Sequence, residues 1–439
     1  MDIQLRLTTA LALAALLYAV RVGAAAGDPA VAPALPAIAP GTTITMQNWR
    51  DYQQYMPDGM ISLFEGKYFW KMPRDVLINV GPTVIHPLPK GYLDATEKYA
   101  SQVQLGMLPD GGFMVANYRG GEPFPNPATP HRGWKILADF WYRYIPHLVV
   151  NSQDNLGFFC TEDSYRSISC IKSLWVYRQL SFNTDPGIPA TIAGGEGKFF
   201  TMWAMVYEPE QEKYSATLTI GFTDPARPQE IYAFRPALRR YEPVASAARC
   251  ASNGSDATPD DGRFGFNGNI TLFQAKLLGE RKVLTLEDFG TAGGDFPGNY
   301  YMPLGWPKPS WGKWEVRDAW VIDVRRLPAH RRGYCYGKRI MYIDKQFYGL
   351  LWEDLYDVRM RPWKFVFDQP IVIDVPGAGP QNSSGAHISH IWDVQNKHAT
   401  FSGPADGHGY DVLINSEVPQ QWRSISKYTT PGGLGSIMR

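Results

Sequence analysis

Strict alternation of apolar and polar side chains is the feature of this sequence that most limits its fold. In residues 314–327, Val316, Trp320 and Ile322 share one parity, whereas Arg317 and Asp323 share the other. Successive side chains of a strand point to opposite faces, so the pattern predicts a strand with one buried and one solvated face. Residues 214–222 alternate in the same way and predict a second strand.

Rings and turn residues extend this interpretation to most of the chain. Aromatic residues make up 13% of the sequence, with 42 Gly and 35 Pro, a combination that favours strands joined by punctuated loops. Residues 338–357 are typical of a hairpin with its turn near Asp344, and 96–105 of a strand that places Tyr99, Val103 and Leu105 on one face. Residues 133–146 fit both the helical and the strand period. No βαβ spacing and no internal repeat occur, so we predict a mainly β, antiparallel fold.

Two short helices are expected where the fold begins. Trp49, Tyr52 and Met56 lie three and four residues apart and predict the first helix, which Pro57 ends. A second short helix is expected from residue 60 to Gly66, a residue type that commonly follows a helix C-terminus.

The N-terminus has the layout of a secretory signal peptide. Arg6 precedes an apolar run over residues 7–20, and small residues follow up to Ala26. We predict a signal peptide over 1–26, cleaved near Ala25 or Ala26, then an Ala/Pro-rich tether over 27–44. An uncleaved anchor is the alternative. No cysteine lies near the cleavage region, so a soluble, exported protein without a lipid anchor is expected.

The rest of the chain, 45–439, is interpreted as a single domain. The polar, Gly-rich segment 246–265 is the best candidate for an internal boundary, but the strands on either side of it look alike. We therefore predict one domain with a long loop near 246–265. That loop could be a docking element or a plain solvent loop.

Four cysteines fit an oxidising compartment: Cys160, Cys170, Cys250 and Cys335. They allow three pairings. Cys160 with Cys170 would close a short hairpin-like loop, and Cys250 would then pair with Cys335. Four free thiols are the alternative, and the chain has no CxxC spacing that would favour zinc.

Charge and motifs exclude several functions. The formal net charge is +1, which gives no reason to expect nucleic acid and no strong attraction to an anionic surface. Motifs for nucleotide binding, serine hydrolysis and zinc proteolysis are missing. His387, His390 and Asp393 are spaced three apart, which would suit a metal only if they shared a helix face. We predict no metal, no cofactor and no catalytic residues, although spatially paired carboxylates remain an alternative.

Aromatic clusters give the strongest local signal of a site. Rings crowd residues 64–70, 140–144 and 199–203, so the sheet either packs on both faces or exposes rings on a concave surface. Apolar pockets are made of such groups, and sugars also bind aromatic rows. A large aromatic core is the competing interpretation. The candidates for an apolar ligand site are Phe64, Tyr68, Trp70, Trp141, Tyr144 and Trp203.

Several long segments resemble the bacterial domain of unknown function family 1329. They include MQNWRDYQQYMPDGMISLFEGKYFWKMP, VGPTVIHPLPKGYLDATEKYASQVQL, GWKILADFWYRY and CYGKRIMYIDKQFYGLLWEDLYD, and the likeness covers about residues 45–435. The resemblance implies an exported protein of Gram-negative bacteria, similar to periplasmic and outer-membrane lipoprotein-sorting proteins. It implies a curved, incomplete antiparallel β-barrel whose open side is plugged by short helices, with the two predicted helices as the plug.

The same resemblance suggests a function. It implies a soluble periplasmic carrier for a lipid or another hydrophobic molecule, working with a resistance-nodulation-division type transporter in the inner membrane and an outer-membrane protein. This is an argument from fold analogy. The alternatives are a periplasmic adaptor without a small ligand, and a hydrolase acting on a lipid or glycan.

Overall fold

A computed structural model describes residues 36–151, 156–244, 257, 266, 269–286, 296–404 and 412–438. All of these residues belong to one compact unit, Val31–Arg439. The predicted signal peptide, the tether up to residue 35 and the loop 246–265, apart from Ala257, lie outside the described residues.

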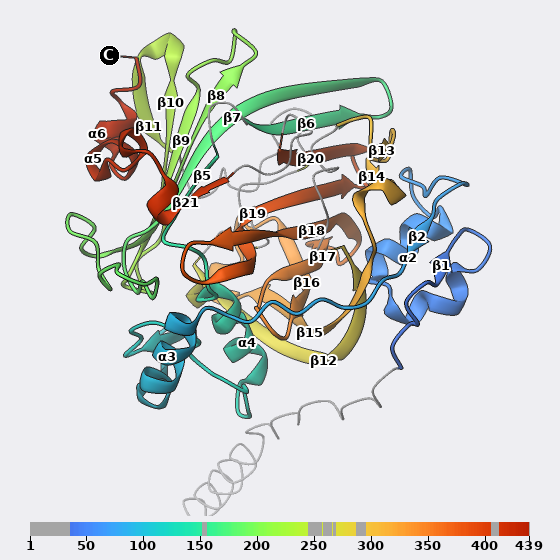
Figure 1. The fold of residues 1–439 in the computed structure, drawn as a ribbon, viewed down its shortest axis with the longest axis horizontal. Helices are drawn as coiled ribbons and strands as arrows, with labels where there is room; N and C mark the ends of the chain where they lie inside the picture. Colours follow the sequence, from blue (N-terminus) through green and yellow to red (C-terminus); the bar gives the residue numbers. More distant parts are fainter. Residues whose placement is uncertain are drawn as a thin grey trace, which may run out of the picture. The chain divides into compact units, whose positions relative to one another are not determined.

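A large antiparallel sheet dominates the fold (Figure 1). Its main path runs β11-β10-β9-β8-β7-β6-β20-β19-β18-β17-β16-β15-β12, and β5 and β21 pair beside β7. Within the described residues, β11 and β12 end this path and do not pair with each other, so the sheet stays open. The predicted fold class, a curved and incomplete antiparallel barrel with short helices, is confirmed. The strands are β5 Leu148–Asn151, β6 Gly157–Asp163, β7 Ser167–Gln179, β8 Lys198–Glu208, β9 Ala216–Phe222, β10 Glu230–Arg235, β11 Arg240–Pro243, β12 Phe273–Thr285, β15 Glu315–Arg326, β16 Tyr336–Asp344, β17 Leu350–Asp357, β18 Pro362–Val375, β19 Gly379–Asp393, β20 His398–Pro404 and β21 Val412–Ile414.

The two helices expected at the start of the fold are present. A 3-10 helix, η1 (Trp49–Tyr55), precedes Pro57, and α2 (Asp58–Glu65) ends at Gly66, whose φ of 63° suits glycine. The rings of residues 66–70, which the sequence analysis placed in the sheet, do not lie in a strand, because residues 66–71 form turns and irregular backbone. Glycine at the helix end and Pro73 shortly beyond it favour a bend rather than an edge strand.

Two further segments are helical. One was predicted as a strand, and the other fitted both the helical and the strand period. The strand expected over 96–105 begins only at residue 104, in β3 (Gln104–Met107), because α3 (Lys90–Tyr99) continues through its first half. Ala95, Glu97 and Lys98 are good helix formers, which outweighs the short apolar alternation. The ambiguous segment 133–146 contains α4 (Arg132–Trp141). The minor elements are β1 Thr43–Ile44, β2 Ile78–Asn79, η2 Ala100–Gln102, β4 Phe113–Ala116, η3 Pro236–Leu238, η6 Ile270–Leu272, β13 Tyr300–Tyr301, β14 Trp306–Pro307, η8 Pro309–Trp311, η9 Pro328–His330, η10 Asn415–Glu417, η11 Gln420–Trp422, α5 Ile425–Tyr428 and α6 Pro431–Leu434.

The strongest strand predictions are confirmed. Residues 216–222 form β9, 315–326 form β15, and β16 with β17 makes the predicted hairpin. One detail is wrong: the face of β15 expected to be solvated is largely buried, and the side chain of Arg317 on it is only 2% exposed. Its Nε donates to Asp344 Oδ2 at 2.8 Å, and Glu315 lies 3.6 Å away. Ion pairing therefore allows a charged residue to occupy an interior position.

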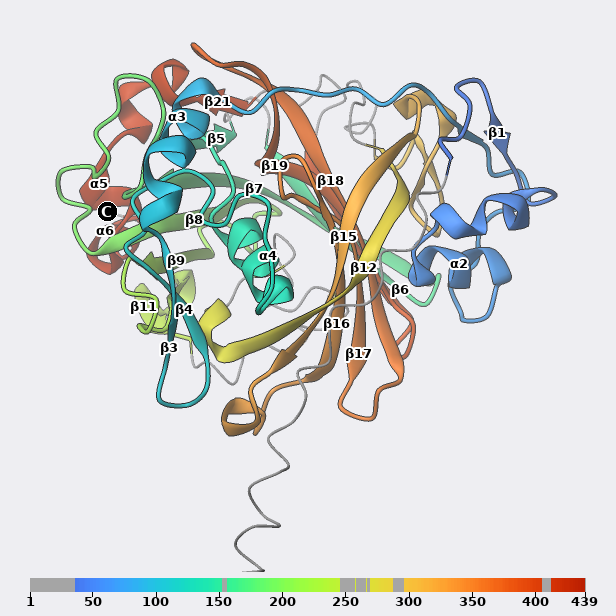
Figure 2. The same ribbon diagram turned by 90° about the horizontal axis from the view of Figure 1, so that it is seen from below.

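The sheet packs on both faces. We call the side to which Trp352, Phe367 and Trp392 point the aromatic face, and there the rings stack with Trp306 and with the N-terminal segment around Phe64. We call the opposite side the α4 face, because β12 and β15 contact α4 on that side. Figure 2 shows the strands curving around α4, with α2 on the other side of β15–β17. The two predicted plug helices therefore cover the aromatic face, and α4 is the helix inside the curve.

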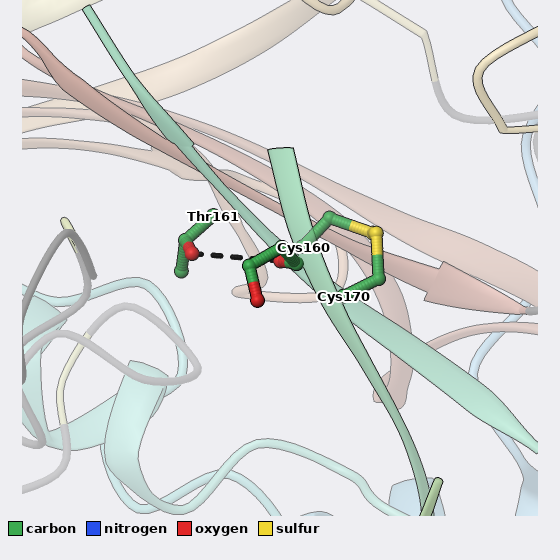
Figure 3. The surroundings of a disulfide bond; sticks show 4 residues. Cys160, Thr161 and Cys170 are labelled. Carbon is green, nitrogen blue, oxygen red and sulfur yellow. Dashed lines mark hydrogen bonds between the residues drawn. A yellow bond between two sulfur atoms is a disulfide. The ribbon is translucent and has the colours of Figure 1, made fainter. Parts of the chain in front are cut away.

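A disulfide joins Cys160 on β6 to Cys170 on β7 (Figure 3). The two residues are directly opposite partners in the β6–β7 register, so the near pairing considered for the sequence is the one that forms. Cys335 is also disulfide-bonded. Cys250, its predicted partner, lies outside the described residues.

Candidate ligand-binding face

Apolar side chains on the α4 face of β6, β7 and β8 remain partly exposed. Trp175 on β7 pairs in register with Ala204, and Tyr177 pairs with Met202 on β8. Phe159 and Ile171 continue this face across β6 and β7. Apart from Tyr177, which is buried, these side chains are all partly exposed, although both edges of β7 are paired.

The other side of the same strands is closed. Leu174, Val176 and Trp203 alternate with the partly exposed residues and are almost completely buried. They pack in one cluster with Val418, Trp422, Tyr428 and Leu434 from the C-terminal segment. The C-terminal helices therefore complete an ordinary core on one face, and the partly exposed apolar surface belongs to the α4 face alone.

Helix α4 brings another ring to this surface. Trp141, at its last turn, is partly exposed and lies 6.0 Å from the ring of Phe200, which stacks on Tyr177 at the same centroid distance. The start of the helix is seated firmly on the sheet: a Cβ on Gly133 would overlap the backbone of Leu277 in β12. Arg132 pairs with Glu280 at 3.1 Å. Trp141 therefore projects from a fixed helix.

Two buried ionisable groups meet the α4 face where the helix ends. Arg143 is nine-tenths buried, and its Nη1 donates to the carbonyl of Phe140 at 2.7 Å. Burial lowers the pKa of Arg143 to about 10, against the opposing charges of Tyr177 and Asp368. Burial also raises the pKa of Asp368 on β18 to about 8, although the charge of Arg143 lowers it. The polar end of this face is thus a guanidinium near a carboxyl group that titrates close to neutrality.

Two more carboxyl groups lie close to each other at α4, Asp139 within the helix and Glu122 before it in the chain. Asp139 is fully buried and accepts the N–H of Phe124 at 2.9 Å, while its Oδ2 has no partner among the described residues. Burial, and secondarily the charge of Glu122, raises the pKa of Asp139 well above its usual range. Burial likewise raises the pKa of Glu122, which hydrogen-bonds Tyr348. Asp139 and Glu122 are 17 positions apart in sequence and lie in different elements, so no sequence pattern could have predicted that they lie close together.

The six predicted ligand-site residues fall into separate regions. Phe64 packs on Trp49 and Trp306, Trp70 donates to the carbonyl of Asp393, and Tyr68 meets Phe365, all on the aromatic face. Tyr144 donates to Asp185 at 2.6 Å and is buried. Trp203 meets Tyr428 in the C-terminal cluster. Only Trp141 joins the partly exposed α4 face, where Trp175 and Met202 were not singled out.

The residues considered as a possible metal site, His387, His390 and Asp393, do not lie on a helix. Residues 387–393 lie in β19, where alternate residues point to opposite faces. His390 is fully buried on the aromatic face beside Gln369, and Asp393 accepts from Trp363 and Asn396. Burial lowers the pKa of His390 to about 3. Among residues whose side chains are described, no group of His, Cys, Asp and Glu is arranged to hold a metal.

The chain belongs to the DUF1329 family: residues 43–434 match the family described as "Protein of unknown function (DUF1329)". No curated protein matches it. In the described residues, no helix has both the length and the apolar character needed to cross a bilayer.

Three solved structures are similar in fold. A domain named for outer-membrane lipoprotein sorting, from Vibrio parahaemolyticus, is 12% identical, covers 66% of this chain and 96% of its own, and has a TM-score of 0.45. A DUF1329 protein from Desulfovibrio piger is 9% identical, covers 69% and 100%, and scores 0.44. A LolA superfamily protein from Nitrosomonas europaea is 11% identical, covers 64% and 92%, and scores 0.35.

Proposed function

We propose that this protein binds a lipid or another hydrophobic molecule on the α4 face of β6–β8 and carries it through the periplasm. The observation that supports this proposal is the difference between the two faces of β7: Leu174 and Val176 are buried, whereas Trp175 between them is partly exposed. Interior strands of a domain normally bury their apolar side chains. A contiguous apolar patch left accessible is typical of a binding surface.

The chemistry of this surface suits an amphipathic ligand. Trp141, Trp175, Met202 and Ile171 offer flat and flexible apolar contacts, and each CH₂ group that they remove from water contributes about 0.8 kcal/mol. Arg143 and Asp368 provide a polar end close to Tyr177. We propose that acyl or ring portions lie along β7 and β8, with a polar group directed toward Arg143.

The proposed periplasmic location and the proposed partner proteins have less direct support. The predicted signal peptide and the disulfide favour export to an oxidising compartment. We propose that an inner-membrane transporter and an outer-membrane protein deliver and receive the ligand, as the family resemblance implies. We propose no catalytic role.

Titration with the apolar fluorophore N-phenylnaphthylamine tests the binding surface. We expect saturable binding by the wild type, and at least about tenfold weaker binding by Trp175→Glu and by Met202→Glu, because each variant puts an unpaired carboxylate on the apolar contact. Leu238→Glu is the matched control, since Leu238 is 52% exposed and lies outside this face. Unchanged affinity in both α4-face variants, with unfolding midpoints like that of the control, would rule out this surface.

A further inference from the structure

The antiparallel topology places four turns side by side at one end of the sheet. The strand order β7-β6-β20-β19-β18-β17-β16-β15 brings together the turns 164–166, 394–397, 358–361 and 327–335. Figure 2 shows the last two of these at its lower end, below the labels of β16 and β17. Strands are about 4.8 Å apart, so successive turns lie about 10 Å from one another. We call these four turns the turn rim.

The turn rim is strongly basic in a chain that is otherwise balanced. Its four turns contain six Arg and Lys residues and no Asp or Glu, whereas the whole chain has 43 basic and 42 acidic residues. Arg166, Arg332 and Arg359 are exposed, and none of them has an ion-pair partner in the described part of the chain. Arg361 pairs with Asp357, and Lys397 lies over the ring of Phe69.

Apolar side chains stand between these cations. Val358 is 66% exposed and Met360 is 46% exposed, and they alternate with Arg359 and Arg361 in one turn. Tyr165, in the turn 164–166, is 45% exposed. Apolar side chains flanked by arginine are typical of protein surfaces that bind an anionic bilayer. The apolar groups enter the interface, and the guanidiniums contact phosphates.

We propose that the turn rim docks on a bilayer that contains anionic phospholipid. Charge complementarity selects this partner: Arg166, Arg332 and Arg359 are exposed and have no ion-pair partner in the described part of the chain, and their planar guanidiniums suit phosphate. Asp163, Asp357 and Asp393 directly precede three of the turns, and Asp357 pairs with Arg361, so the charge available for docking is that of the three exposed arginines Arg166, Arg332 and Arg359. Docking at the rim does not require an apolar ligand on the α4 face, so the two properties can be measured separately.

Vesicle sedimentation tests the docking surface. We expect the full chain to bind vesicles of phosphatidylethanolamine and phosphatidylglycerol, to bind phosphatidylcholine vesicles much more weakly, and to be released as salt is raised. Each basic residue near such a surface contributes enough that Arg332→Gln with Arg359→Gln should weaken binding about thirtyfold. Val358→Ser with Met360→Ser should weaken it at least tenfold.

Lys90→Gln with Lys98→Gln is the matched control. Both lysines are exposed on α3, so this variant loses the same net charge away from the rim, and any contribution of the N-terminal segment is common to all variants. We expect it to bind like the wild type. Equal losses in the rim and α3 variants, equal binding to both vesicle types, or no binding to the anionic vesicles would overturn membrane docking at the rim.

Discussion

The backbone of Gly59 lies directly against the carboxyl group of Asp354, 295 residues further along the chain. Its N–H donates to Asp354 Oδ1 at 3.1 Å, and a Cβ at this position would overlap that oxygen and lie 2.7 Å from the ring of Phe365. This contact fixes the first turn of α2 on β17 and β18. It also requires a buried carboxyl group to accept from a helix N-terminus.

Gly59→Ala should therefore destabilise the protein by about 1–3 kcal/mol, because the added methyl group overpacks a fully buried site. Denaturant unfolding measures the difference. Gly432→Ala is the control, since only Thr430 Oγ1 lies within 4 Å of the Cβ it would add. Equal stability of the two variants would show that α2 is not held by this contact.

Asp354 should also make stability depend on pH. Burial, with the nearby charge of Asp58, raises the pKa of Asp354 to about 8 from 3.8. The folded state then binds more protons than the unfolded state between these values, so this group lowers stability as pH rises from about 4 to 8, with no further change above 8. The stability of Asp354→Asn relative to wild type should rise over that window. A constant difference from pH 4 to 9 would contradict the raised pKa.

The buried ion pair of Arg317 should contribute far more to the free energy of unfolding than a neighbouring exposed ion pair. Arg317→Met removes the guanidinium that pairs with the buried Asp344 and Glu315, and we expect a loss of about 3–5 kcal/mol. Arg325→Met, on the same strand, breaks a pair whose arginine is 37% exposed, and we expect about 1 kcal/mol or less. Denaturant unfolding of both variants gives the comparison, and similar losses would count against the account.

The ring of Phe64 separates two interpretations of the early aromatic cluster. The sequence predicted it in a ligand site, and the structure packs it against Trp49 and Trp306 with 3% exposure. We expect Phe64→Ala to lower stability by about 3–5 kcal/mol and to leave N-phenylnaphthylamine affinity unchanged. Weakened affinity with wild-type stability would instead support the ligand-site interpretation.

The disulfide of β6 and β7 closes a loop between residues ten apart in sequence. Cys160→Ser with Cys170→Ser should lower stability by about 3 kcal/mol through the entropy of the unfolded chain. Unfolding of this double variant measures the effect without reducing the disulfide of Cys335. No loss would mean that the hairpin register alone holds these strands.

Local patterns predicted much of the fold, and their failures have physical causes. Alternation located β9 and β15, although both faces of each strand are largely buried. It misplaced Arg317, because the partner that stabilises its burial, Asp344, lies on another strand. The segment of α4 satisfied both periods, and only its contact with β12 and β15 settles it as a helix.

The candidate site was harder to predict than the fold. Ring density pointed to Phe64, Trp70 and Trp203, which are core residues in two separate clusters. Trp175 and Met202 stand in strands whose two faces are both apolar, so composition cannot tell which face remains accessible. That distinction depends on the C-terminal segment, which covers only one face and packs there from more than 200 residues away.

Mass spectrometry of solvent extracts from the purified protein tests the central claim most directly. We predict a stoichiometric lipid or other apolar molecule in extracts of the wild type prepared from its own periplasm, and much less of it in Trp175→Glu prepared identically. Leu238→Glu should retain it. No apolar molecule from the wild type, or equal amounts from wild type and Trp175→Glu, would contradict a carrier that binds its ligand on the α4 face.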